Sequence, residues 1–133
     1  MPALRTYLVE DSPVIRENLI AALEELVDIE IVGTADSESV AAYWLGHEPA
    51  GWDLVVIDIF LKSGSGLGVL ASCRDRRPGQ RLVVLSNYAT ADMRRKCVEL
   101  GADAVFDKSN EIDALVTYCQ RLSDPASALG PLS

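Results

Sequence analysis

The sequence has few of the residues that build zinc sites and disulfide frameworks. Among its 133 residues are three cysteines and one histidine. Cys73, Cys97 and Cys119 are widely separated, and no C-x-x-C pattern or Cys/His cluster is present. A zinc or redox site is therefore unsupported, and we expect three reduced, partly buried thiols. The single histidine, His47, lies near an expected helix end and is interpreted as a cap residue.

Positive charge and long apolar runs are also scarce. Twelve Lys and Arg residues oppose twenty Asp and Glu residues, for a net charge of −8. This balance argues against direct binding to the nucleic acid backbone, which requires clustered positive charge. No apolar run approaches the ~20 residues of a membrane-spanning helix, and residues 1–5 contain no apolar region of signal-peptide length. We expect a cytoplasmic protein with no membrane contact, and the length suits one domain.

What is present is a regular alternation of strand-like and helix-like segments. Ser12 and Pro13 predict a helix start, and Ser37 predicts another. The first helix should bury one apolar face, formed by Ile15, Leu19, Ala22, Leu23 and Leu26. The expected strands are 4–9, 30–35, 54–58, 81–86 and 102–106. The expected helices are 13–26, a segment from 37 to near Pro49, one between 66 and Pro78, 90–100 and 110–122. Five such units predict one parallel sheet that is doubly wound, with helices on both faces.

Polar residues occur where the expected strands end. Glu10 and Asp11 follow the first strand, Asp58 ends the third, Ser86 ends the fourth and Lys108 follows the fifth. Parallel strands bring these ends to one edge, where ligands bind in such sheets. Three converging carboxylates would repel one another, and Mg²⁺ suits such a donor set. A carboxylate beside Mg²⁺ and a lysine can attack phosphorus as a nucleophile.

The sequence resembles the receiver domains of bacterial two-component response regulators. The matching segments occur in the family's order and spacing over about residues 4–122: Leu8-Val-Glu-Asp-Ser-Pro13, Val55-Val-Ile-Asp58, Gly66-Leu67, Val83-Val-Leu-Ser86, Gly101-Ala-Asp103 and Asp107-Lys108. The resemblance implies an α/β fold with a doubly wound five-stranded parallel sheet, of the (βα)5 flavodoxin-like type with strand order 2-1-3-4-5. It implies a receiver domain over residues 1–123. The composition of residues 124–133 indicates a loose tail.

The resemblance also implies a role for each residue at the strand ends. Asp58 would accept a phosphoryl group from a sensor histidine kinase or phosphotransfer protein. Glu10, Asp11 and Asp58 would hold Mg²⁺, with the Phe60 carbonyl as a further ligand. Ser86 would contact the phosphoryl group and Lys108 would pair with it. The protein would be a signalling switch that catalyses chemistry only on its own aspartate.

Three positions depart from the family's pattern. Lys62 replaces a proline that often lies four residues after the acceptor. Ser109 replaces the proline that usually follows the lysine through a cis peptide bond, which is costly before other residues. Val105 replaces the aromatic residue that moves on activation, and Phe106 should lie on the opposite strand face.

Two hypotheses follow from aromatic residues near the acceptor. The resemblance implies that Phe60 and Tyr88 flank the approach of hydrolytic water, and their rings then predict a long-lived phosphorylated state. Tyr88 could also move with Ser86 in place of the missing aromatic at 105.

A basic run is the remaining surface signal. Arg94, Arg95 and Lys96 form either a solvated face or a docking surface for an acidic partner or a second copy. The resemblance places that surface next to the face formed by helix four, strand five and helix five.

Alternative functions differ in what happens to phosphate. A metal-dependent phosphohydrolase would need a second acid or base at position 60, where the sequence has Phe60. A pseudo-receiver would bind partners without phosphorylation. No output domain could fit in the last ten residues, so we expect either a stand-alone receiver that acts by protein contacts or the receiver portion of a longer DNA-binding regulator.

Overall fold

The computed structural model of the protein describes residues 3–87 and 89–123, so Tyr88 and the expected tail 124–133 lie outside the described residues. Strands and helices alternate from end to end. Their bounds are β1 (Leu4–Val9), α1 (Pro13–Leu26), β2 (Ile29–Ala35), α2 (Glu38–His47), β3 (Leu54–Ile57), α3 (Gly66–Ser72), β4 (Arg81–Ser86), α4 (Ala91–Glu99), β5 (Ala104–Asp107) and α5 (Ile112–Ser123).

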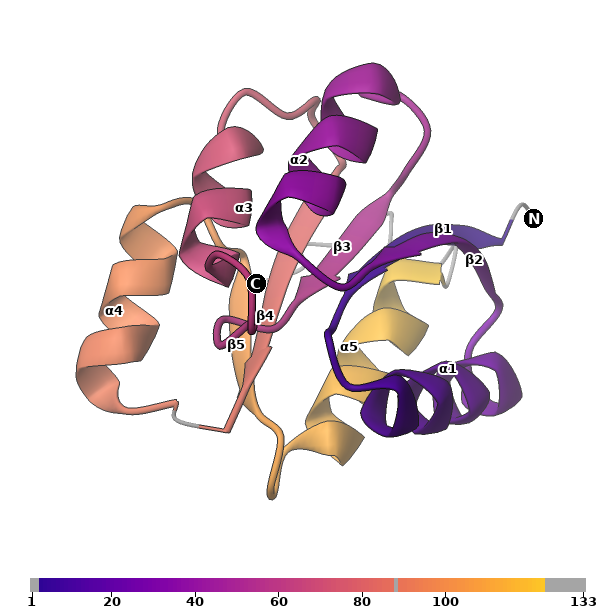
Figure 1. Ribbon diagram of the computed structural model, residues 1–133. Coiled ribbons are helices and arrows are strands. Elements are labelled where there is room, and N and C mark those ends of the chain that lie inside the picture. The colour runs from indigo at the N-terminus through magenta and orange to yellow at the C-terminus, as the bar shows by residue number, and fades with distance from the viewer. Residues whose placement is uncertain (1–2, 88, 124–133) are drawn as a thin grey trace.

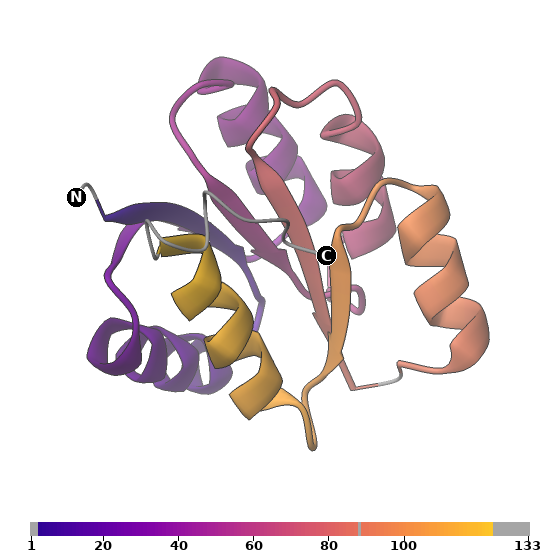
Figure 2. The same cartoon turned by 180° about the vertical axis from the view of Figure 1, so that it is seen from behind.

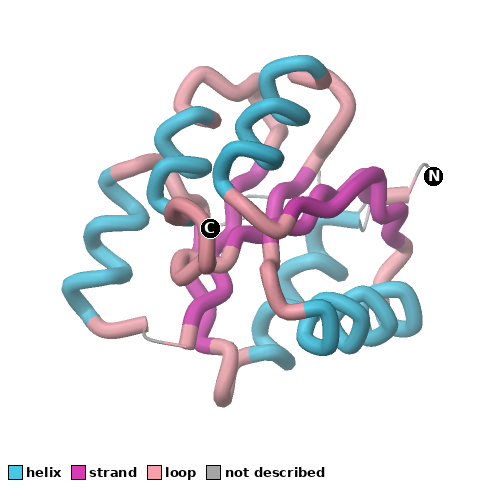
Figure 3. Tube along the Cα trace, in the orientation of Figure 1, coloured by secondary structure: helices cyan, strands magenta, loops and turns pink. Residues whose placement is uncertain are grey.

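The five strands form one parallel sheet in the order β2-β1-β3-β4-β5, which confirms the expected fold. The sheet is the twisted central layer in Figure 3, with helices around it. β3 lies in the middle and all four of its residues are buried, which explains its uninterrupted apolar sequence.

Each face of the sheet carries its own hydrophobic core. The first core packs α2, α3 and α4 against side chains such as Tyr7, Val55 and Val84. The second packs α1 and α5 against Leu8, Val56 and others of the opposite face. Figures 1 and 2 show the two groups of helices on opposite sides of the sheet. The crossovers therefore leave β1 and β3 adjacent, with their connections running to opposite faces.

Local signals in the sequence set the helix starts, as predicted at Ser12 and Ser37. The side chains of Ser12, Ser37 and Thr90 accept hydrogen bonds from backbone N–H groups in the first turns of α1, α2 and α4. At the end of α4, Gly101 has φ +108°, and the Ala102 N–H donates to the Cys97 carbonyl at 2.9 Å. This is a glycine-terminated helix end.

Some sequence expectations were wrong in detail. β5 begins at Ala104 rather than 102, because the Ala102 N–H is still bonded to α4. Leu26, expected on the buried face of α1, is 51% exposed. The chain turns directly after it, and Val27 is buried in its place.

The three cysteines and His47 have roles in packing and helix termination. Cys73, Cys97 and Cys119 are free and buried, as expected. His47 lies at the end of α2 with Nδ1 2.7 Å from the Tyr43 carbonyl oxygen, and its ring stacks on Tyr43. Within the described residues, no helix combines the length and apolar character needed to cross a bilayer.

The first and last described residues lie near each other. Ala3, Leu4, Leu122 and Ser123 help to line a cavity of about 230 Å³. Asp53, just before β3, and Arg81, the first residue of β4, also line this cavity. Both ends of the described chain therefore lie at the edge where the strands begin.

Candidate functional site

The candidate site lies where the strands end, next to the point at which the strand order reverses. The Asp58 N–H donates to the Val9 carbonyl at 2.9 Å, and the Glu10 N–H donates to the Ala35 carbonyl at 2.9 Å. These bonds extend the β-ladders by one residue. They fix the backbone from which Glu10, Asp11 and Asp58 project.

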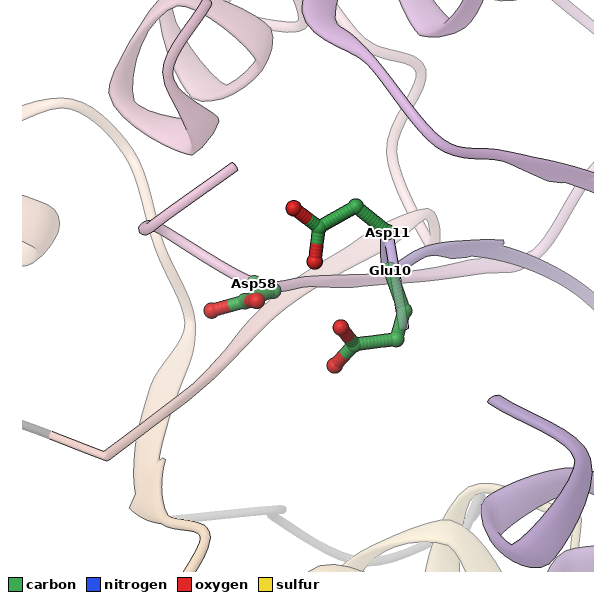
Figure 4. A group of neighbouring side chains, drawn as sticks. All are labelled: Glu10, Asp11 and Asp58. Carbon is green, nitrogen blue, oxygen red and sulfur yellow. The ribbon is translucent and has the colours of Figure 1, made fainter. Parts of the chain in front are cut away.

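Three carboxylates converge in this place. One oxygen from each of Glu10, Asp11 and Asp58 lies within 4.8 Å of the others, and Figure 4 shows their carboxylates gathered around a shared space. Glu10 is 2% exposed and Asp58 is 6% exposed. Burying like charges so closely is unfavourable unless a cation compensates them.

Lys108 supplies part of the compensation. Its Nζ lies 2.5 Å from Glu10 Oε1 and 3.1 Å from Asp58 Oδ2, and its side chain is 8% exposed. Burial alone would lower the pKa of Lys108, but the hydrogen bond to Glu10 and the charge of Asp58 raise it above its usual value. Lys108 is therefore held as a cation between the two carboxylates.

The negative charge that Lys108 does not compensate would suit a divalent cation. Burial raises the pKa of Asp58, the neighbouring Glu10 raises it further, and Lys108 acts in the opposite direction. With all four groups ionised, the three carboxylates and one ammonium carry a net charge of −2. Oxygen donors with that charge fit Mg²⁺, which would favour the ionised form of Asp58.

Backbone N–H groups fix the orientation of each carboxylate. Ser12 N donates to Glu10 Oε2 at 3.1 Å, Phe60 N donates to Asp58 Oδ1 at 3.2 Å, and Lys62 N donates to Asp11 Oδ2 at 2.7 Å. Sequence reasoning missed these donors, because a backbone N–H carries no signal in the residue type. Position 62 is an exception, because proline has no backbone N–H and any other residue at this position can donate.

Ser86 lies at the same edge. It ends β4 and is fully buried, and its carbonyl accepts a hydrogen bond from the Lys108 N–H at 2.9 Å. The peptide bonds of the described residues are all trans, including Lys108–Ser109. The structure thus brings Glu10, Asp11, Asp58, Ser86 and Lys108 to one edge, as the sequence predicted.

The two residues of the expected switch region face opposite ways. Val105 packs against the core under α4. Phe106 packs against the core under α5, where its ring meets Tyr118 edge-on at 5.8 Å. The prediction that Phe106 lies on the opposite face of the strand from Val105 is confirmed.

The basic run on α4 is not uniformly solvated. Arg94 donates to the Ala89 and Val105 carbonyls at 3.0 and 2.9 Å, and it pairs with Glu111 at 2.6 Å. Arg95 pairs with Asp92, whereas Lys96 is exposed. Arg94 therefore has a structural role that neither sequence interpretation included.

Comparison with known proteins identifies the family. The family model described as the response regulator receiver domain matches residues 6–120. The chain belongs to the response regulator receiver domain family. Receiver domains bind Mg²⁺ at an acidic pocket, and the Glu10, Asp11 and Asp58 cluster has that composition.

Curated relatives of this receiver are longer proteins. A protein-glutamate methylesterase/protein-glutamine glutaminase of Rhodospirillum centenum is 28% identical over 131 residues, which are 95% of this chain and 33% of that protein. The DNA-binding transcriptional activator DevR/DosR of Mycobacterium tuberculosis is 27% identical over 100 residues, covering 74% of this chain and 45% of the activator. The chain thus spans between a third and a half of the length of these two relatives.

Solved structures of receivers share the fold. A two-component response regulator of the LuxR family from Aurantimonas has a TM-score of 0.80 and 22% identity, with 96% of this chain and 94% of that chain covered. The response regulator domain of Thermotoga maritima CheB has a TM-score of 0.75 and 18% identity, with 97% and 99% covered. At these identities, the two structures show a shared fold.

Proposed function

We propose that this receiver is a phosphorylation-dependent switch in which Asp58 is the phosphoryl acceptor. The observation that carries the proposal is the environment of Asp58. Its carboxylate lies at the end of the central strand, 3.1 Å from the Lys108 ammonium and within 4.8 Å of oxygens of Glu10 and Asp11. A nucleophile, a fixed cation and a candidate metal site are the parts that phosphoryl transfer requires.

The chemistry is a simple exchange at phosphorus. An oxygen of Asp58 forms a bond to the phosphorus of a phosphohistidine on a sensor kinase or phosphotransfer protein. The bond from phosphorus to the imidazole nitrogen breaks, and the released imidazole takes up a proton. The product is an acyl phosphate on Asp58, and no external substrate is turned over.

The surrounding groups have distinct roles in this proposal. Glu10, Asp11, Asp58 and the Phe60 carbonyl would hold Mg²⁺, which would supply positive charge to the phosphoryl oxygens. Lys108 is already oriented toward Asp58 and pairs with a further phosphoryl oxygen. The Ser86 hydroxyl donates to the same group, and the backbone bond from Lys108 to the Ser86 carbonyl ties their two strands together.

The output is a change in protein contacts on the face formed by α4, β5 and α5. Phosphorylation would bias Ser86 and its loop toward one arrangement, and a homodimer or a target protein would read the result. The greater length of the relatives supports a second form of the proposal, in which this receiver controls an output domain such as a DNA-binding module.

The test is labelling by a small phosphodonor. The protein is incubated with acetyl phosphate and Mg²⁺ and analysed by intact-mass spectrometry. We expect one phosphoryl group on the wild type and on the control Asp36→Asn, which alters an exposed aspartate just after β2 at the same edge. Asp58→Asn should remain unlabelled.

The other outcomes point to other functions. Equal labelling of Asp58→Asn would exclude Asp58 as the acceptor. Absence of labelling in the wild type, with a folded protein, would indicate a pseudo-receiver. Rapid release of phosphate in large excess over protein would indicate a phosphohydrolase instead of a switch.

A further inference from the structure

The connection between β3 and α3 is bonded to one of the candidate metal ligands. The N–H of Lys62 donates to Asp11 Oδ2 at 2.7 Å across 51 positions of sequence. This short bond to a carboxylate is charge-assisted. It joins the segment after the acceptor to the segment after β1.

The other side of the same connection is anchored to α2. Ser65 N donates to Glu38 Oε1 at 2.8 Å, and Glu38 N donates to the Ser63 carbonyl at 3.1 Å. Lys62 thus immediately precedes a short segment, Ser63 to Ser65, that is bonded to Glu38 through the Ser63 C=O and the Ser65 N–H. The direction of the Lys62 N–H is set by the fold rather than by a mobile loop.

Glycines allow this connection to pass close to its neighbours. Gly64 has φ +84°, a conformation that favours glycine. A Cβ on Gly66 would lie 2.2 Å from the Asp58 carbonyl oxygen, and a Cβ on Gly68 would lie 2.2 Å from Glu38 Oε2. The connection and the first turn of α3 are therefore packed against the Asp58 backbone and the Glu38 carboxylate.

We propose that the backbone N–H of Lys62 is a positioning donor for Asp11, which rests on the proposed role of Asp11 as a metal ligand. A carboxylate with one oxygen paired cannot rotate freely about its Cβ–Cγ bond, so its second oxygen is held in one direction. Such donors behind a ligand organise a metal site and strengthen metal binding. Any residue except proline can supply the donor at this position.

The substitution Lys62→Pro removes the donor, and Lys62→Ala keeps it. Mg²⁺ affinity is measured for both variants and the wild type by following amide shifts in ¹⁵N-HSQC titrations, with urea unfolding as the check on folding. We expect Lys62→Pro to weaken Mg²⁺ binding about tenfold. Lys62→Ala should stay within about twofold of the wild type, since the exposed ammonium is screened by salt. Equal affinities for the alanine and proline variants would overturn the proposal.

A second measurement decides the matter if the proline variant fails to fold. Hydrogen exchange of the Lys62 amide is compared between the wild type and Asp11→Ala. Loss of the acceptor should speed that exchange, while the Ser65 amide, bonded to Glu38, should keep its rate. Unchanged exchange at Lys62 would contradict the proposal.

The two levels of inference fail differently. If the wild type neither binds Mg²⁺ nor accepts a phosphoryl group, the proposed function is wrong. If the wild type does both and the two Lys62 variants are indistinguishable, only the positioning role is wrong.

Discussion

At the scale of single residues, the side chain of Phe60, two residues after the proposed acceptor Asp58, should control how long the phosphorylated state lasts. Phe60 is 49% exposed, and its N–H donates to Asp58 at 3.2 Å. A ring at this place would limit the approach of water to the phosphorus of a phosphorylated Asp58. We expect Phe60→Asn to shorten the half-life of the acyl phosphate about fivefold, equivalent to about 1 kcal/mol of barrier.

The lifetime is measured by intact mass after removal of the phosphodonor. Phe60→Leu is the matched control, because it keeps an apolar side chain and the backbone N–H, and its half-life should remain near that of the wild type. A half-life in Phe60→Asn that equals or exceeds the wild-type value would refute the shielding. The contribution of Tyr88, proposed from the sequence, concerns a residue outside the described part of the chain.

The buried thiols give a second test at this scale. Burial raises the pKa of Cys119 to about 12, and burial also raises the pKa of Cys73 and Cys97. Thiolate is the reactive form, so a disulfide reagent such as DTNB should label the native protein very slowly and label three thiols in urea. Fast labelling of the native protein at neutral pH would contradict the described burial.

The same shift predicts a loss of stability in alkali. An unfolded thiol ionises near its ordinary pKa of 9.0, whereas folded Cys119 keeps its proton to about 12. Between these values the unfolded state binds fewer protons, so the free energy of unfolding falls as pH rises. Urea midpoints measured across this range should decline less steeply in Cys119→Ala than in the wild type.

At the scale of elements, Arg94 should hold α4 in place. Its guanidinium bonds to the Val105 carbonyl of β5 and to Glu111 just before α5. Both partners of the ion pair are partly exposed, so solvent reduces its strength. We expect Arg94→Ala to lower the free energy of unfolding by about 1 kcal/mol.

Lys96→Ala is the matched control on the same helix, and urea unfolding should place it within about 0.5 kcal/mol of the wild type. A similar small effect for Arg94→Ala would mean that the bonds to β5 and Glu111 contribute nothing to stability. The arrangement also implies that α4 and the start of α5 respond together to changes in β5.

Elements were more predictable from the sequence than the contacts between them. Ser12 and Ser37 gave correct helix starts because capping is a local interaction. The strand-end residues Asp58 and Lys108 were brought together as predicted, because a parallel sheet fixes where strands end. Leu26 was misplaced because helical periodicity does not show where the packing partner stops.

The supporting interactions of the site were the least predictable part. The bond from the Lys62 N–H to Asp11 joins two loops through a backbone group, and Glu38 acts through contacts with a loop 27 positions away. Neither leaves a periodic or compositional trace. At position 62 the sequence shows a departure from the family's proline, and this alone does not reveal the hydrogen bond to Asp11.

At the scale of the whole molecule, Mg²⁺ should stabilise the fold. An ion that binds only the native state raises the free energy of unfolding by about 2.7 kcal/mol at about 100 times its dissociation constant. The double variant Glu10→Gln/Asp11→Asn should lose this gain, and EDTA should remove it from the wild type. Thermal unfolding monitored by circular dichroism measures both effects.

Glu24→Gln/Glu25→Gln is the control for charge, because it neutralises two adjacent carboxylates on the exposed surface of α1. This variant should keep the full response to Mg²⁺. Stabilisation of the Glu10→Gln/Asp11→Asn protein by Mg²⁺ to the wild-type extent would place the ion elsewhere on this acidic molecule.

The position of the two described chain ends has a practical consequence for handling the protein. Ala3 and Ser123 line one cavity at the edge where the strands begin, whereas Asp58 follows the end of β3 at the other edge. A fluorophore or a surface attached at Ala3 or at Ser123 would therefore lie at the edge opposite to Asp58. Protein immobilised through either of these two residues should keep the Asp58 edge accessible, which suits it to solid-phase screening for a phosphodonor.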